Sequence, residues 1–146
     1  MSRYLLDANA LIALGWPAHE RHSIVQAWFK EHARHGWATT PLTQAAFVRI
    51  VSQPAFSGNL IGPREAAELL SRNLTHRHHS FFPHDMQIAE VAGLCTGGLV
   101  GHRQVTDAYL LALAIKRKCK VVTFDGGVRQ LLATERECLM HVELLG

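Results

Sequence analysis

Three of the four aspartates in this 146-residue sequence stand where a carboxylate can do chemistry. Asp7 follows the short apolar segment 3–6, and Asp125 follows a second such segment, 121–124. Asp107 lies in the first turn of an apolar segment with helical periodicity. Three carboxylates in one cleft would repel one another by several kcal/mol per pair, and a hard divalent cation such as Mg²⁺ or Mn²⁺ relieves that repulsion. The pattern predicts a metal site that activates water and stabilises phosphoryl charge, which is the chemistry of a nuclease.

A simpler interpretation exists for each aspartate taken alone. Asp7 and Asp125 are also suited to cap a helix N-terminus, and Asp107 is favourably placed on a helix dipole. The neighbouring positions avoid charge, which favours a joint role for the three carboxylates. Polar residues beside the aspartates are candidate auxiliary groups that orient a carboxylate or contact a phosphate: Asn9, Thr106 and Thr123.

The elements that must position these residues alternate along the chain. Apolar patterning predicts strands at 3–6, 37–39, 79–82, 121–124 and 142–145. It predicts helices at 10–14, 20–35, 41–52, from 63, from 84 or 85 through 95, and 105–118, with a short helix after 126–127. Alternating strands and helices indicate an α/β domain with a mostly parallel sheet. Ligands of such sheets bind beyond the carboxyl ends of the strands, where Asp7 and Asp125 are expected.

Composition excludes several classes of protein. Apolar residues make up 48% of the sequence, too many for a disordered chain and enough for the core of one domain over residues 1–146. The longest apolar stretch, 108–115, is far shorter than the roughly 20 residues that span a bilayer. Asp7 interrupts the first apolar run before a secretory signal can form, so we expect a cytoplasmic protein with no membrane partner. The net charge of +3 permits a polyanionic partner, and three dispersed cysteines argue against a disulfide framework.

Four segments in this order and spacing resemble the PIN-domain ribonucleases, and within them the VapC toxins of toxin–antitoxin pairs. The segments are LLDANALIAL at 5–14, TPLTQAAFVRIVSQP at 40–54, QVTDAYLLALA at 104–114 and VVTFDGGV at 121–128. The resemblance implies a three-layer α/β/α domain with an endoribonuclease site that binds Mg²⁺ or Mn²⁺. Asp7, Asp107 and Asp125 fall on the family's acidic positions. It also implies a homodimer, an RNA substrate and a VapB-type antitoxin that restrains the enzyme.

The sequence departs from the family pattern at one position. The helix after the second strand usually supplies a glutamate, whereas this chain has Gln44. An amide offers a carbonyl oxygen but no negative charge, so we expect weaker metal binding with the three aspartates still sufficient for activity. The alternative is a PIN module that binds RNA or antitoxin without cleaving.

Two further interpretations concern basic residues and a different reaction. Arg49 and Arg103 lie near the site segments and are candidate contacts for RNA phosphates. The histidine-rich segment 76–84 is predicted to be an exposed polar loop, because no cysteine lies nearby. A phosphatase with Asp7 as nucleophile is disfavoured, since the dehalogenase-type enzymes require an aspartate where this chain has Asn9.

Overall fold

A five-stranded sheet forms the centre of the computed structural model, which describes residues 3–58 and 61–146. Its strand order is β3-β2-β1-β4-β5, and every neighbouring pair is parallel. The strands are β1 (Arg3–Leu6), β2 (Trp37–Thr39), β3 (His79–Phe81), β4 (Cys119–Thr123) and β5 (Val142–Leu144). The predicted α/β class and parallel sheet are therefore confirmed.

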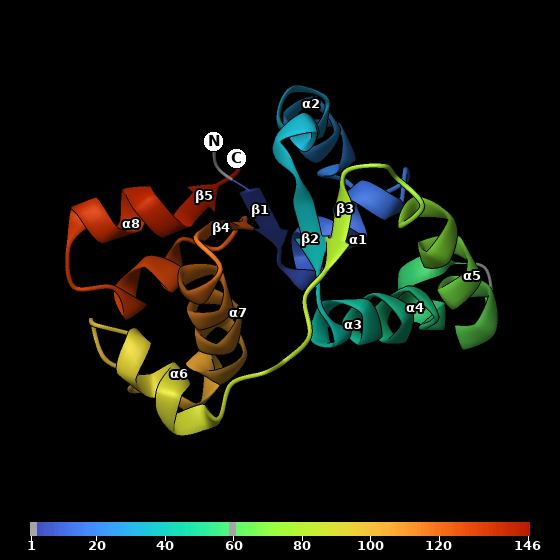
Figure 1. Cartoon of the computed structure of the whole chain (residues 1–146). Helices are drawn as coiled ribbons and strands as arrows, with labels where there is room; N and C mark the ends of the chain where they lie inside the picture. The colour runs from blue at the N-terminus through green and yellow to red at the C-terminus, as the bar shows by residue number, and fades with distance from the viewer. Residues whose placement is uncertain (1–2, 59–60) are drawn as a thin grey trace.

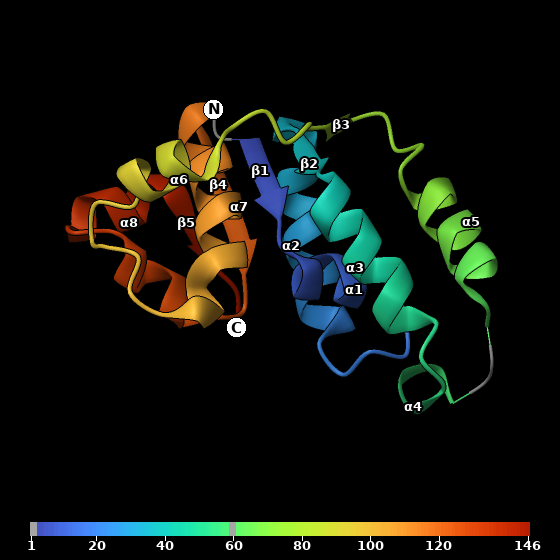
Figure 2. The same ribbon diagram turned by 90° about the horizontal axis from the view of Figure 1, so that it is seen from below.

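Helices cover both faces of the sheet, giving three layers (Figure 1). The view in Figure 2 shows α6, α7 and α8 on one side of β1 and β4, with α1, α2 and α3 on the other. The bounds are α1 (Ala8–Gly15), α2 (His22–His32), α3 (Pro41–Val51), α4 (Pro54–Ser57), α5 (Pro63–Asn73), α6 (Ile88–Leu94), α7 (Val105–Lys116) and α8 (Glu135–His141). Short 3₁₀ turns occupy 33–35, 102–104 and 126–131.

The predicted start of α6 at residue 84 or 85 is wrong. The preceding segment stays extended because the hydroxyl of Tyr109, on α7, bonds both backbone groups of Met86. The Met86 amide donates to that hydroxyl at 3.2 Å, and the hydroxyl donates to the Met86 carbonyl at 2.7 Å. The helix therefore begins only at Ile88.

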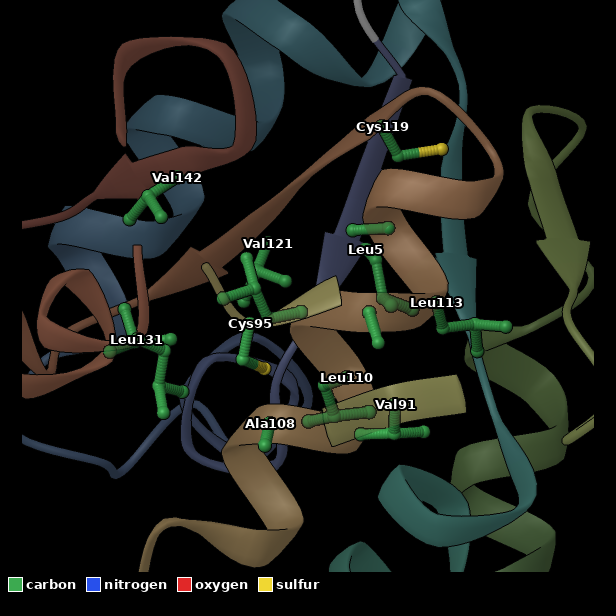
Figure 3. Packing of buried hydrophobic residues seen from close by; sticks show 14 of the residues in the cluster. Leu5, Val91, Cys95, Ala108, Leu110, Leu113, Cys119, Val121, Leu131 and Val142 are labelled. Carbon is green, nitrogen blue, oxygen red and sulfur yellow. The ribbon is translucent and has the colours of Figure 1, made fainter. Parts of the chain in front are cut away.

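Two apolar clusters separated by the sheet form the core. Successive strand residues alternate between them: Leu5 belongs to the cluster beneath α6, α7 and α8, whereas Leu6 belongs to the cluster with α1, α2, α3 and α5. Figure 3 shows the first cluster, which contains Leu5 of β1, Val121 of β4, and Leu110 and Leu113 of α7. Burial of both sheet faces explains why β1, β2 and β4 are largely apolar, whereas the edge strand β3 is polar and partly exposed.

The helix after β2 has the predicted start. Thr40 accepts a hydrogen bond from the Thr43 amide at 3.2 Å, and the Thr43 hydroxyl accepts one from the Thr40 amide at 3.0 Å. Pro41 occupies the first helical position, where its missing N–H costs nothing. This double cap anchors α3 directly to the carboxyl end of β2.

Glycine substitutions at two positions are expected to act in opposite directions. A Cβ at Gly97 would lie 2.5 Å from the Gln130 carbonyl oxygen, so Gly97→Ala should destabilise the fold by about 1–3 kcal/mol. Gly93, within α6, has open space around its Cα, and Gly93→Ala should stabilise by about 0.5–1 kcal/mol. Urea denaturation of both variants tests this pair; equal midpoints would contradict it.

Candidate functional site

The aspartates Asp7 and Asp125 follow two strands that lie side by side. β1 and β4 pair with Leu6 opposite Val122, and the Asp7 amide donates to the Val122 carbonyl at 3.0 Å. Asp125 comes two residues after the end of β4. The parallel pairing therefore places both aspartates at the same edge of the sheet, as predicted.

Asp7 is held in place by its own helix and by β4. Its side chain is 7% exposed, and Oδ1 accepts a hydrogen bond from the Ala10 amide at 2.8 Å, which caps α1. Burial, and to a smaller extent the charges of Asp107 and Asp125, raise the pKa of Asp7 to about 6. Hydrogen bonds from the Thr123 hydroxyl and the Ala10 amide oppose this rise in the pKa. Asp7 is thus a rigid carboxylate that feels both other aspartates.

Asp107 and Asp125 complete an electrostatically coupled group. Asp107 is half-buried in the first turn of α7, and burial together with the charge of Asp125 raises its pKa. Asp125 is exposed and caps the following turn, with Oδ1 accepting from the Gly127 amide at 2.8 Å. The capping interpretation is therefore correct for Asp7 and Asp125, and it coexists with the coupling between the carboxylates.

Thr123 connects two of the aspartates. Its side chain is 3% exposed, and its oxygen accepts a hydrogen bond from the Asp125 amide at 3.0 Å. The same hydroxyl bonds the Asp7 carboxylate. One buried side chain therefore restricts rotation of the Asp7 carboxylate and holds the backbone at Asp125.

In the part of the chain that the structure describes, no basic side chain forms an ion pair with any of the three aspartates. Within residues 3–58 and 61–146, the carboxylates that form ion pairs belong to Asp85, Glu135 and Glu143. In the same ranges no three His, Cys, Asp or Glu side chains are gathered closely enough to hold a metal ion as they stand. Three uncompensated oxygen ligands nevertheless match the chemistry of Mg²⁺ or Mn²⁺, which prefer carboxylates and retain water ligands.

Gln44 and Arg49 lie along a groove between two helices. The Gln44 amide nitrogen donates to the Thr39 hydroxyl at 3.0 Å, and that hydroxyl also lies 2.8 Å from Nε2 of His79. Both Gln44 and Arg49 line a groove of about 750 Å³ between α3 and α5. No contact joins either side chain to the three aspartates within the described parts of the chain.

The remaining predicted candidates differ in their surroundings. Asn9, Thr106 and Arg103 are exposed near the starts of α1 and α7, and none bonds an aspartate within the described ranges. The expectation of an exposed histidine loop is wrong for His76 and His79, which are half-buried against Trp37. Trp37 donates through Nε1 to His76 Nδ1 at 3.2 Å, so this segment packs rather than binding a metal.

Comparison with known proteins identifies the family to which this fold belongs. The PIN domain family matches residues 4–131, and the chain belongs to that family. Within it, the relatives are VapC ribonucleases of Mycobacterium tuberculosis. The chain is 42% identical to ribonuclease VapC38 over 85% of this chain and 86% of the relative, and 39% identical to VapC39 over 85% and 89%.

Solved structures show the same fold at low sequence identity. A Rickettsia felis VapBC2 structure, bound to a fragment of its promoter, has a TM-score of 0.65 at 13% identity over 99% of each chain. The structure of FitAB bound to the IR36 DNA fragment has a TM-score of 0.62 at 16% identity, covering 97% of this chain and 94% of the other. These likenesses confirm the PIN-type architecture.

Proposed function

We propose that residues 1–146 act as one PIN-like domain, a metal-dependent endoribonuclease toxin of a type II toxin–antitoxin system. The observation that carries the proposal is the group of three coupled, uncompensated carboxylates, Asp7, Asp107 and Asp125, at one edge of a PIN-type sheet. The VapC ribonucleases at about 40% identity support the choice of reaction.

The three aspartates would hold Mg²⁺ or Mn²⁺. The bound ion supplies an activated water and stabilises the negative charge that develops on the phosphate. Hydrogen bonds from Ala10 and Thr123 fix the orientation of the Asp7 carboxylate. Asn9 and Thr106, at the first turns of α1 and α7, are proposed to contact the substrate phosphate.

Cleavage of purified RNA tests this function. The protein should cut single-stranded or loop RNA in Mn²⁺ or Mg²⁺ and lose that activity in EDTA, with sites mapped from new 5′ ends. The competing function, an RNA- or antitoxin-binding module without catalysis, is motivated by Gln44 in place of the family's glutamate. RNA binding without cleavage at any Mn²⁺ concentration would favour that module.

The Gln44→Glu variant separates these two functions. A carboxylate at this position adds the charge that an amide lacks, so we expect tighter Mn²⁺ binding and faster cleavage. Without metal, the fourth carboxylate should lower the melting temperature, and added Mn²⁺ should restore it. Calorimetric titration of parent and variant measures their affinities for Mn²⁺. Equal affinities would mean that Gln44 only hydrogen-bonds Thr39 and lies outside the metal site.

The proposed toxin requires partners in the same compartment. Two solved structures with the same fold are named VapBC2 and FitAB, each bound to a DNA fragment, and this likeness supports our proposal of a VapB-type antitoxin as the partner of this chain. We further propose a cytoplasmic homodimer, which sedimentation equilibrium of the purified protein tests. None of the helices described in the structure is long and apolar enough to cross a membrane.

A further inference from the structure

Arg21 is fixed over an aromatic ring beside the acidic site. Its guanidinium carbon lies 4.7 Å from the centre of the Phe124 ring. Phe124 stands between Thr123, which bonds Asp7, and Asp125 itself. The cation therefore lies against the chain segment that supplies two residues of the site.

The packing of α2 brings Arg21 to this edge. Arg21 immediately precedes α2, and seven residues later Trp28 donates through Nε1 to Glu143 of β5 at 3.0 Å. Trp28 also packs against Tyr4, near the start of β1, with ring centres 5.0 Å apart. The helix thus runs from the carboxyl edge of the sheet towards its amino edge, and its first residues lie beside the site.

The side-chain donors of Arg21 have no hydrogen-bond or ion-pair partner among residues 3–58 and 61–146, whereas its backbone amide donates to His19 Nδ1 at 3.0 Å. Arg117 also stacks on a ring, that of Phe82, but it forms an ion pair with Asp85 at 3.3 Å. Arg3 faces the same ring and donates to the Arg117 carbonyl at 2.9 Å. The Arg21 side chain has neither kind of partner within the described residues. Its five N–H groups are therefore held in one place by the stacking contact and remain free for a ligand.

We propose that Arg21, stacked on Phe124, is an RNA-binding residue that contacts the substrate strand on the β4 side of the carboxylates. An edge with three aspartates repels a polyanion, so a substrate needs fixed cations nearby. A planar guanidinium can donate hydrogen bonds to two oxygens of one phosphate, or it can stack on a base. Both modes of binding suit single-stranded RNA. The exposed Arg103, four residues before Asp107, offers a second cation near the start of α7. This inference rests on the proposed ribonuclease function.

Binding measured without catalysis tests the inference. A fluorescein-labelled, mixed-sequence 20-nucleotide RNA is titrated with protein in EDTA between 50 and 200 mM salt. Arg21→Ala should weaken binding about tenfold and reduce the slope of log affinity against log salt by about 0.7. Arg21→Lys should restore the slope but only part of the affinity. An ammonium neither forms the bidentate hydrogen bonds of a guanidinium nor stacks on an aromatic ring as a guanidinium does. Arg21→Gln keeps a planar group without the charge and should behave like Arg21→Ala.

The Arg136→Ala variant is the matched control for Arg21→Ala. Arg136 is an equally exposed arginine on α8, and Arg136→Ala should leave both affinity and slope unchanged. Parental affinity and slope in Arg21→Ala and Arg21→Gln would overturn the inference while leaving the ribonuclease proposal standing. A parent protein that neither binds nor cuts RNA would overturn both.

Discussion

Asp7→Asn and Asp107→Asn are each expected to abolish metal-dependent RNA cleavage while the protein stays folded. Each change removes one negative charge from the metal ligands and keeps the size of the side chain. A metal ion stabilises the transition state by several kcal/mol, so the loss should be at least about 100- to 1,000-fold in the single-turnover rate. The rate is measured on end-labelled RNA in Mn²⁺, with circular dichroism to verify the fold.

Asp85→Asn is the matched control for both variants. Asp85 is exposed and forms ion pairs with Lys116 at 3.8 Å and Arg117 at 3.3 Å. It is not one of the three carboxylates of the proposed site. Surface ion pairs contribute little, and this variant should cut RNA at the parental rate. Parental cleavage by Asp7→Asn or Asp107→Asn would mean that the site is wrongly assigned.

The same Asp7→Asn change is expected to stabilise the metal-free protein at neutral pH. Burial raises the pKa of Asp7 from 3.8 to about 6, so ionisation of this carboxyl is unfavourable in the folded state. The difference between these pKa values corresponds to about 3 kcal/mol. An asparagine still accepts from Ala10 and carries no charge to be repelled. Urea denaturation in EDTA at pH 7 should therefore show a higher free energy of unfolding for the variant.

The direction of the pH dependence gives this prediction a second test. Between pH 3.8 and about 6 the folded state binds more protons at Asp7 than the unfolded state, so its contribution to stability falls as pH rises. The advantage of Asp7→Asn should be near zero below pH 4 and complete above pH 6. An advantage that is constant across this range would exclude ionisation of Asp7 as its cause.

Sequence periodicity predicted most of this fold because local pattern and tertiary environment agree. The strands β1, β2 and β4 are largely apolar, and the helix that follows β2 has a recognisable start at Thr40–Pro41. The first turn of α6 was misplaced because a hydroxyl 23 residues further along the chain bonds Met86. Such a contact leaves no trace in the local sequence.

The carboxylates were predictable for a topological reason, whereas their neighbours were not. Parallel strands end at one edge, so residues that follow strands, such as Asp7 and Asp125, must meet there. The bond between Gln44 and Thr39, and the stacking of Arg21 on Phe124, depend on how helices pack against the sheet. No spacing rule relates Arg21 to a residue about 100 positions away.

The strand order also determines when, during protein synthesis, such an enzyme can become active. β1 lies between β2 and β4, so its partner on one side is made early and its partner on the other is made late. A nascent chain on the ribosome carries one of the three carboxylates until Asp107 is added, and it lacks β4 until residue 123 has emerged. Unfinished chains therefore cannot assemble the three-carboxylate site beside the ribosomal and transfer RNA that surround them. Because of this order of synthesis, the chain gains the capacity to cut RNA only when nearly the whole fold is present. At that stage the proposed antitoxin can bind and restrain it.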